Sequence, residues 1–299
     1  MIVNASTLIA TQKSFHAIFM ASMMAATSRW AKRAVEIPMT MRTQNINWLG
    51  RAPAMREWLD SKRSEQLRGF DFTLKTKDWE STIEVDRNDI EDDALGLYRP
   101  AIEMLGMRAK QFPDRRLSEV RIANPLCYDG QNFYDTDHAE GDSGVQSNLL
   151  TGTGVTAPTV RADFFKAVEA LEKFKDDKGE PFIEGGVDNP QLIATIPPLL
   201  RSVFEDINNP GPGSLVQKTV IPYEVDSRLA DANDWYLDFV GYPIKPFLKL
   251  NRKDTQFVAL DDPNASETVF MRKKFYYGVE GRGDMMPGFW QMSAKTTNT

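Results

Sequence analysis

The chain is poor in the side chains on which most catalysis and metal binding depend. Its 299 residues include one cysteine and two histidines. A single cysteine excludes an intramolecular disulfide and any zinc site made of several cysteines, and it is typical of a protein synthesised in a reducing compartment. The sequence also lacks a GxSxG elbow and an HExxH pair, and "TGTG" at 151–154 lacks the Lys-Ser/Thr of a phosphate loop. These absences argue against an enzyme.

Long apolar runs are missing as well. No stretch of about 18 apolar residues occurs, so the sequence predicts no membrane-spanning helix. The first 28 residues are partly apolar, but they lack a basic start and are interrupted by Gln12, Lys13 and His16, which is not the pattern of an export signal. We therefore expect a soluble protein that contacts no membrane.

The charge of the chain is small overall but unevenly distributed. A net charge of −6, with 41% hydrophobic and 10% aromatic residues, predicts a globular protein with a substantial core and no dedicated nucleic-acid-binding character. Residues 1–69 hold ten Lys or Arg against four Asp or Glu, so the remaining residues carry about −12. The chain is thus a basic segment attached to an acidic body.

Two segments have an apolar side that nothing nearby in the sequence covers. An amphipathic helix is predicted near the N-terminus, where four apolar residues recur on one side: Phe15, Ile18, Phe19 and Met23. Its apolar side could be covered by the body of the same chain, by a neighbouring subunit or, as the least favoured alternative, by a membrane surface. Residues 69–87 nearly alternate on either side of "KTKD" and predict a long exposed hairpin, whose apolar face carries Phe70, Phe72, Trp79, Ile83 and Val85. A two-stranded ribbon is marginally stable alone, so this hairpin needs a surface to lie on.

The rest of the chain mixes helices and strands without a βαβ repeat, which predicts an α+β fold. The longest predicted helix spans about 95–112 and is stopped by Pro113; near its start, Pro100 either begins the regular helix or kinks it. Another helix is expected over about 160–178, and a strand followed by a helix over 191–209. Strands are expected at 215–221, 235–240, 246–250, 256–260 and 268–279, and a Gly-rich turn at "GRGD" (281–284).

One short stretch concentrates polar chemistry: "CYDGQNFYDTDHAEGDSG" at 127–144 holds the only cysteine and one of the two histidines. Asp129-Gly130 between "LCY" and "QNFY" predicts a two-residue type I′ hairpin turn. The "DTDHAEGD" that follows starts like a calcium loop, but it lacks the Gly at the sixth position and the Glu at the twelfth, which excludes an EF-hand. A solvated acidic loop is the expected structure.

Two other interpretations of this stretch stay open. The carboxylates of Asp135 and Asp137 with the imidazole of His138 could hold a cation more loosely, and a metal-dependent enzyme could be built on them. Cys127 and His138 could form a thiol–imidazole pair if the fold brought them together, although no family signature surrounds the cysteine. We expect no cofactor and no catalytic residue.

Several long collinear stretches resemble one known family. The chain is similar to the major head subunit of Mu-like phages over "MIVNASTLIATQKSFHAIFMASMM", "WLGRAPAMREWLDSKR", "FTLKTKDWESTIEVDRNDIEDDALGLYRP" and "CYDGQNFYDTDH", and more loosely over "KFYYGVEGRGDMMPGFWQM". The resemblance implies the α+β capsid fold of phage Hong Kong 97. That fold would divide the chain into an N-terminal arm (1–50), an E-loop region (51–88), a peripheral domain with a long spine helix (89–154 and 263–299) and an axial domain (155–262).

The resemblance also implies a function in assembly. A major capsid protein self-assembles into the pentamers and hexamers of an icosahedral phage head that encloses double-stranded DNA, in the cytoplasm of a bacterial host. Its partners would be other copies of itself, scaffold, portal and decoration proteins, and packaged DNA touched non-specifically at the inner surface. An encapsulin-like cargo shell is the alternative with the same fold. The expected inter-subunit contacts are Phe15, Ile18, Phe19, Met23, Phe70, Phe72, Trp79, Ile83 and Val85.

Overall fold

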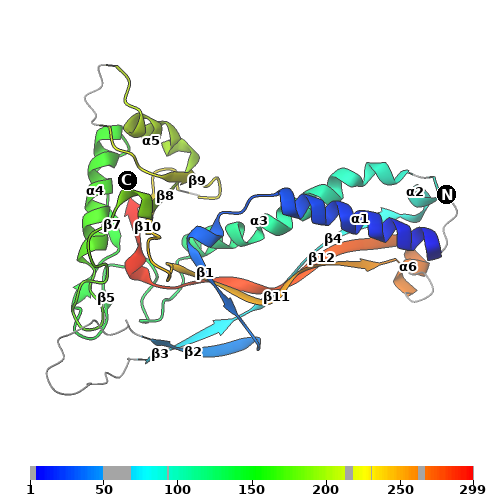
Figure 1. Ribbon diagram of the computed structural model, residues 1–299, viewed down its shortest axis with the longest axis horizontal. Helices are drawn as coiled ribbons and strands as arrows, with labels where there is room; N and C mark the ends of the chain where they lie inside the picture. The colour runs from blue at the N-terminus through cyan, green and yellow to red at the C-terminus, as the bar shows by residue number, and fades with distance from the viewer. Residues whose placement is uncertain are drawn as a thin grey trace.

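The chain folds into two bodies joined along the long axis of the molecule (Figure 1). The computed structural model describes residues 5–49, 69–92, 94–212, 218–229, 231–261 and 267–298. We call the elongated part, at the right of Figure 1, the peripheral body and the part at its left the axial body. Each body has its own sheet, so the α+β class expected from the sequence is confirmed.

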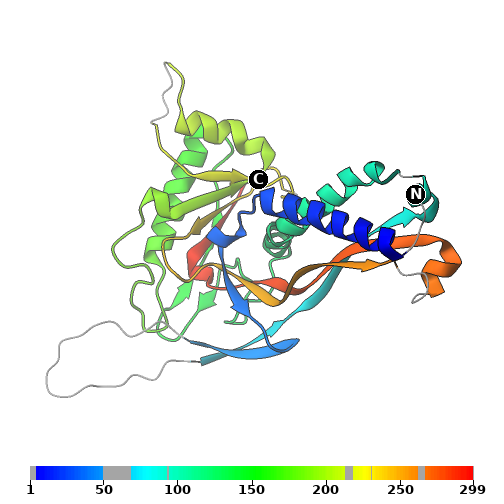
Figure 2. The same cartoon turned by 45° about the vertical axis from the view of Figure 1, so that its right-hand side comes forward.

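The peripheral body is built on a four-stranded sheet covered by two long helices. The strand order is β1 (Ala34–Pro38), β11 (Phe247–Leu260), β12 (Lys274–Pro287) and β4 (Lys77–Asp86). Helices α1 (Ala5–Ala25) and α3 (Arg99–Ala123) run side by side along this sheet in both views (Figure 1, Figure 2). The short α2 (Arg87–Glu91) and α6 (Glu267–Arg272) lie at the far end of the body.

Helix α3 is longer than the sequence predicted. It begins at Arg99, so the expected start near Pro100 is confirmed, but it runs through Pro113 to Ala123. An internal proline removes one backbone hydrogen bond and crowds the preceding turn, at a cost of roughly 3 kcal/mol. Leu117 and Val120 are buried beyond that point, and their packing offsets this cost. The predicted stop at Pro113 is therefore wrong.

Helix α1 is held against the peripheral body by its own apolar side. Phe15 and Phe19 are buried, with ring centroids 5.0 Å from Tyr277 and 5.4 Å from Phe257 respectively. Gly106 lets α1 and α3 approach closely, since a Cβ there would lie 2.5 Å from the carbonyl oxygen of Phe19. The predicted N-terminal helix is confirmed, and it is covered by its own chain.

The hairpin expected at 69–87 pairs differently from the prediction. Strand β3 (Gly69–Lys75) pairs with β2 (Thr43–Leu49) in a separate two-stranded sheet, whereas β4 pairs with β12 over its whole length. The break at "KTKD" is where the chain passes from the projecting β2–β3 hairpin into the peripheral sheet (Figure 1). Period-two alternation identifies a strand but not its partner, which is why the predicted pairing is wrong.

The axial body is built on a five-stranded sheet. Its order is β7 (Leu149–Thr151), β13 (Ser293–Thr297), β10 (Trp235–Phe239), β8 (Leu192–Ile196) and β9 (Tyr223–Val225). Every residue of β8 and β10 is buried, and helices α4 (Ala157–Lys173) and α5 (Arg201–Asn208) pack beside the sheet. Strand β13 comes from the last residues of the chain, so this body joins segments far apart in sequence.

The other predicted elements are partly confirmed. The strand and helix of 191–209 and the strand of 235–240 are present. The two strands expected at 246–250 and 256–260 are one strand, β11, and the strand expected at 268–279 is α6 followed by β12. Helix α4 ends at Lys173 because residues 175–181 fold back in a turn.

Two further predictions have different outcomes. The predicted turn at "GRGD" is wrong, because these residues lie inside β12. Glycine is needed at 283 because β11 passes close by: a Cβ there would lie 2.4 Å from the carbonyl oxygen of Leu250. Residues 218–221 form no strand, and the rest of the strand expected at 215–221 lies outside the described residues. Residues 50–68, which include the start of the expected E-loop region, also lie outside the described residues.

Candidate functional sites: the polar loop and the peripheral groove

The polar stretch at 127–144 begins with a tight turn. The backbone N–H of Gly130 donates to the Cys127 carbonyl oxygen at 3.1 Å, and Gly130 has a φ of +87°. The turn that this hydrogen bond closes has Tyr128 and Asp129 as its central residues, and Gly130 follows them. A turn is therefore present, but the predicted two-residue type I′ turn centred on Asp129-Gly130 is wrong, because Asp129 lacks the positive φ that this type requires.

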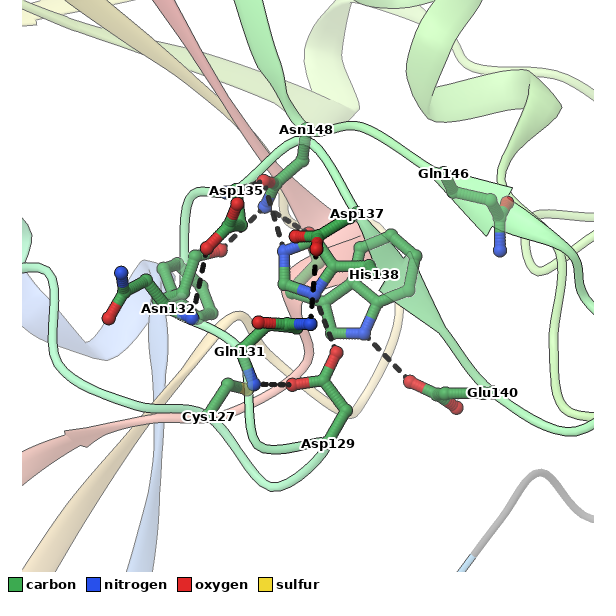
Figure 3. A network of polar contacts seen from close by, with 12 residues as sticks. Cys127, Asp129, Gln131, Asn132, Asp135, Asp137, His138, Glu140, Gln146 and Asn148 are labelled. Carbon is green, nitrogen blue, oxygen red and sulfur yellow. Dashed lines mark hydrogen bonds and ion pairs between the residues drawn. The ribbon is translucent and has the colours of Figure 1, made fainter.

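The imidazole of His138 lies buried at the centre of the loop (Figure 3). Its Nδ1 is 2.6 Å from Asp129 Oδ2 and its Nε2 is 3.2 Å from Asn148 Oδ1. The ring also stacks on the indole of Trp290, with centroids 4.2 Å apart and planes 6° from parallel. Both nitrogens and one face of the ring are thus occupied, which leaves no free nitrogen for a metal ion or a substrate.

Asn148 connects the loop to the C-terminal segment. Its Nδ2 donates to the carbonyl oxygens of Phe133 (2.7 Å) and Ser293 (3.1 Å), and its Oδ1 accepts from the Asp135 backbone N–H (2.9 Å). No sequence pattern singles out this residue, because a buried asparagine in a polar stretch is indistinguishable from a solvated one. Its full set of hydrogen bonds makes it a structural residue.

Glu140 makes a second connection to the same segment. One oxygen of its buried carboxylate accepts hydrogen bonds from Tyr128 Oη, from Trp290 Nε1 at 2.7 Å and from Gln291 Nε2 at 2.8 Å. Burial raises the pKa of Glu140 above its ordinary value despite these donors. The loop is therefore a buried polar clamp on residues 290–293, just before β13.

The described residues do not form the cation site considered for Asp135, Asp137 and His138. Among the described residues, no three His, Cys, Asp or Glu side chains come together in a way that could hold a metal ion. The Thr136 backbone N–H lowers the pKa of Asp135, and a hydrogen bond to Asp135 raises the pKa of Asp137. The expectation of a solvated acidic loop holds for Asp137, which is exposed, and is wrong for the buried His138 and Glu140.

The thiol–imidazole pair is not formed either. Cys127 Sγ donates to the Gly288 carbonyl oxygen at 3.3 Å, while His138 contacts Asp129 and Asn148. Burial raises the pKa of the Cys127 thiol well above its ordinary value, so the reactive thiolate is disfavoured. Both residues of the supposed pair are structural.

Three of the predicted contact residues are covered by their own chain. Phe15, Phe19 and Val85 are at most 2% exposed and belong to the core of the peripheral body. The argument that they need a neighbouring subunit to cover them is therefore wrong, because the sheet and helices of the same chain do so. Their contact with a neighbour stays a prediction.

The other predicted contact residues keep some exposure where they are described. Ile18, Met23 and Ile83 are half-buried against the core of the peripheral body, and Phe72 packs at the base of the projecting hairpin. The side chain of Phe70 lies outside the described residues. These contacts also stay predictions.

Trp79 forms one wall of a groove between α3 and the peripheral sheet. Its Nε1 donates to the Gly283 carbonyl oxygen at 2.8 Å, and its ring packs on Phe112 with centroids 4.9 Å apart. The Arg116 guanidinium lies 4.7 Å from the centre of the indole. The groove has a volume of about 520 Å³ and extends along β11 and β12. Below, we call it the peripheral groove.

The groove is rimmed by charge. Seven basic and four acidic residues line it, and several of them pair with one another, such as Arg116 with Asp284 at 2.8 Å and Lys253 with Glu280 at 2.5 Å. Arg108 is exposed and has no ion-pair partner among the described residues. It is therefore available to a molecule lying in the groove.

Within the same described residues, no helix combines the length and apolarity needed to cross a bilayer.

Comparison with known families gives a match over most of the chain. The family described as "Mu-like prophage major head subunit gpT" matches residues 8–161 and 217–299. The Mu-like prophage FluMu major head subunit of Haemophilus influenzae is 26% identical over 270 residues, which are 90% of this chain and 66% of that protein. The major capsid protein of Escherichia phage Mu is 32% identical over 199 residues, which are 65% of this chain and 63% of that protein. This chain thus spans just under two thirds of the length of both relatives.

Solved structures show the same fold. The procapsid of bacteriophage JBD30 superimposes with a TM-score of 0.62 at 25% identity, over 99% of this chain and 77% of that one. A virus-like particle from Pyrococcus furiosus gives a TM-score of 0.55 at 8% identity, over 95% of this chain and 98% of that one. The α+β fold of this chain is therefore the capsid fold of the Hong Kong 97 type.

Proposed function

Because this chain belongs to the family of Mu-like prophage major head subunits, we propose that it is a structural major capsid protein, which assembles into pentamers and hexamers of an icosahedral phage head. The observation that carries the proposal is the family match, which covers residues from both bodies. The relatives are named as head subunits and capsid proteins, which are structural proteins and not enzymes. The shell would enclose double-stranded DNA and assemble in the bacterial cytoplasm.

The projecting β2–β3 hairpin makes the principal contact between subunits. Within the part of the chain that the structure describes, its two strands pair only with each other, so their outer edges keep unpaired backbone groups that a neighbour can cover. In this proposal the hairpin lies in the peripheral groove of the adjacent copy, against Trp79 and Phe112. Many such modest contacts, repeated round closed symmetry, stabilise a shell that no single contact would hold.

The division of the chain follows the sheets. The arm, the E-loop region, the peripheral domain and the axial domain keep their predicted order, with strand pairing as support for four shifts of boundary. The E-loop is the β2–β3 hairpin, so it begins at 43 and ends at 75. Strands β4 and β11 go with the peripheral domain, and β13 goes with the axial domain.

A phage head also requires partners other than copies of the capsid protein. The first 69 residues carry ten basic against four acidic side chains, which suits contact with packaged DNA or with the acidic surface of a neighbour. One solved relative is a JBD30 capsid decorated with minor capsid protein trimers, and a decoration protein is a reasonable partner here too. Scaffold and portal proteins complete the expected set.

The first prediction tests assembly and the groove together. The purified full-length chain should form closed particles visible by electron microscopy. Arg108→Glu reverses an unpaired charge on the rim of the groove and should lower the yield of particles about tenfold, which corresponds to about 1.4 kcal/mol of contact energy. Lys110→Glu makes the same change on α3 at a position that does not line the groove, so it should assemble normally.

The outcomes separate the parts of the proposal. A parent chain that stays monomeric at high concentration would contradict the shell itself. If the parent forms particles and Arg108→Glu forms them equally well, the groove is not the contact and the shell remains. An encapsulin-like shell would also form particles, but purified from the native host they would contain a cargo protein in place of phage DNA.

A further inference from the structure

A cluster of buried charges lies where the peripheral and axial bodies meet. Arg33, directly before β1, donates through Nε to Asp238 Oδ2 at 2.9 Å and through Nη1 to Glu224 Oε2 at 2.6 Å. Arg121, in the last turn of α3, donates through Nη2 to the same Asp238 oxygen. Ser293 Oγ donates to the other Asp238 oxygen at 2.7 Å. We call these residues the junction cluster.

The cluster connects elements from both bodies. Arg33 directly precedes β1 of the peripheral sheet and Arg121 lies in α3, whereas Asp238, Glu224 and Ser293 lie on β10, β9 and β13 of the axial sheet. The partners are separated by 117 to 205 residues in the sequence. These ion pairs therefore cross the junction and do not stabilise a single element.

The charges are far more buried than those of a surface ion pair. The side chain of Asp238 is 0% exposed, that of Arg121 is 1% and that of Arg33 is 4%. The Arg121 guanidinium also lies 5.2 Å from the ring of Tyr236 and 5.0 Å from the ring of Phe247. Buried charges cost several kcal/mol each unless their geometry is well matched, so such a cluster adds little net stability but strongly favours one arrangement of its partners.

Guanidinium geometry makes this preference directional. The planar fork of Arg33 points two nitrogens at two carboxylates, Asp238 and Glu224, that lie on different strands. A rotation of the axial sheet relative to β1 would break at least one of these bonds. A point charge such as a lysine ammonium would tolerate that rotation far better.

We propose that the junction cluster sets the angle between the axial body and the peripheral body, and thereby the curvature of the assembled shell. The second half of this statement rests on the proposed function, while the first half concerns the single chain. Arg33 and Arg121 act as positioning residues. Loss of the fork should widen the range of angles that the two bodies adopt.

The experiment replaces the fork and keeps the charge. Arg33→Lys should remain folded, and small-angle scattering of the unassembled chain should shift its maximum dimension to larger or more widely spread values. Particles of this variant should also show a broader distribution of diameters by electron microscopy. The exposed Arg87–Glu91 pair on α2 serves as the control, because Arg87→Lys changes the same chemistry away from the junction.

Each outcome decides the proposal. A folded Arg33→Lys variant whose scattering profile and particle diameters match those of the parent would overturn it, since a purely stabilising role changes melting temperature and not shape. If Arg33→Lys fails to fold, Asp238→Glu, which keeps the charge but lengthens the arm, gives the same readouts. If the parent forms no particles, scattering of the single chain still decides the angle, and only the shell proposal fails.

Discussion

At the scale of single residues, the dense polar loop at 127–144 is a structural clamp. His138, Glu140 and Asn148 all hold residues 290–293 at the start of β13: His138 stacks on Trp290, and the other two side chains form hydrogen bonds with this segment. A buried polar network of this kind favours one arrangement when complete and is costly when one member is removed. The stretch with the most chemical character in the sequence therefore serves the fold.

Glu140→Gln should show this in the pH dependence of stability. Burial raises the folded pKa of Glu140 above its ordinary value of 4.5, so the carboxyl group stabilises the fold below that pH and loses this contribution as pH rises through the folded pKa. The amide does not titrate. The variant should therefore be more stable relative to the parent at pH 7 than at pH 4, as measured by urea unfolding.

A nearby exposed glutamate provides the control for this experiment. Glu180→Gln makes the same change on the turn at 175–181, where the side chain is exposed. As a substitution of an exposed side chain, it should change the free energy of unfolding by less than about 0.5 kcal/mol in either buffer. A pH-independent difference for Glu140→Gln would contradict the role of burial.

At the scale of elements, the close crossing of α1 and α3 decides where the N-terminal helix lies. Gly106 allows the contact, and Ser22 Oγ donates to the Glu103 carbonyl oxygen beside it. With α1 docked in this way, its phenylalanines complete the core of the peripheral body. The apolar side of α1, which was expected to contact a neighbouring subunit, thus packs within its own subunit.

Gly106→Ala tests this crossing. Although alanine favours a helix by about 1 kcal/mol over glycine, its Cβ would lie 2.5 Å from the Phe19 carbonyl oxygen, and α1 would have to shift. We expect a net loss of roughly 1–3 kcal/mol in the free energy of unfolding. Gly96→Ala is the matched control, because nothing lies within 4 Å of a Cβ there, and it should be neutral.

At the scale of the whole molecule, neither body is one continuous stretch of chain. The axial sheet places β13, from the last residues, between β7 and β10, while the peripheral sheet combines strands from 34–38 to 274–287. The chain therefore crosses the junction several times. Folding of the axial body depends on a strand that is distant in sequence from most of its neighbours.

Ala294→Asp should show this dependence. Ala294 is fully buried in β13, and an unpaired charge there should destabilise the protein by at least about 3 kcal/mol, seen as insolubility or a strongly lowered melting temperature. Val145→Asp puts the same charge on a side chain that is 74% exposed and should change stability by less than about 0.5 kcal/mol. Equal effects of the two variants would mean that β13 is not required.

The sequence by itself determined the class, the family resemblance and the existence of most elements, because hydrophobic periodicity and long collinear motifs are local properties of the chain. Hydrophobic periodicity indicated α1, α3 and β10 in this way. Only the tertiary structure decided that β3 pairs with β2, that Pro113 lies within a helix, and that Arg33 and Arg121 share Asp238. These features depend on contacts between residues distant in sequence, and no local pattern specifies which partner a strand edge or a buried charge will find.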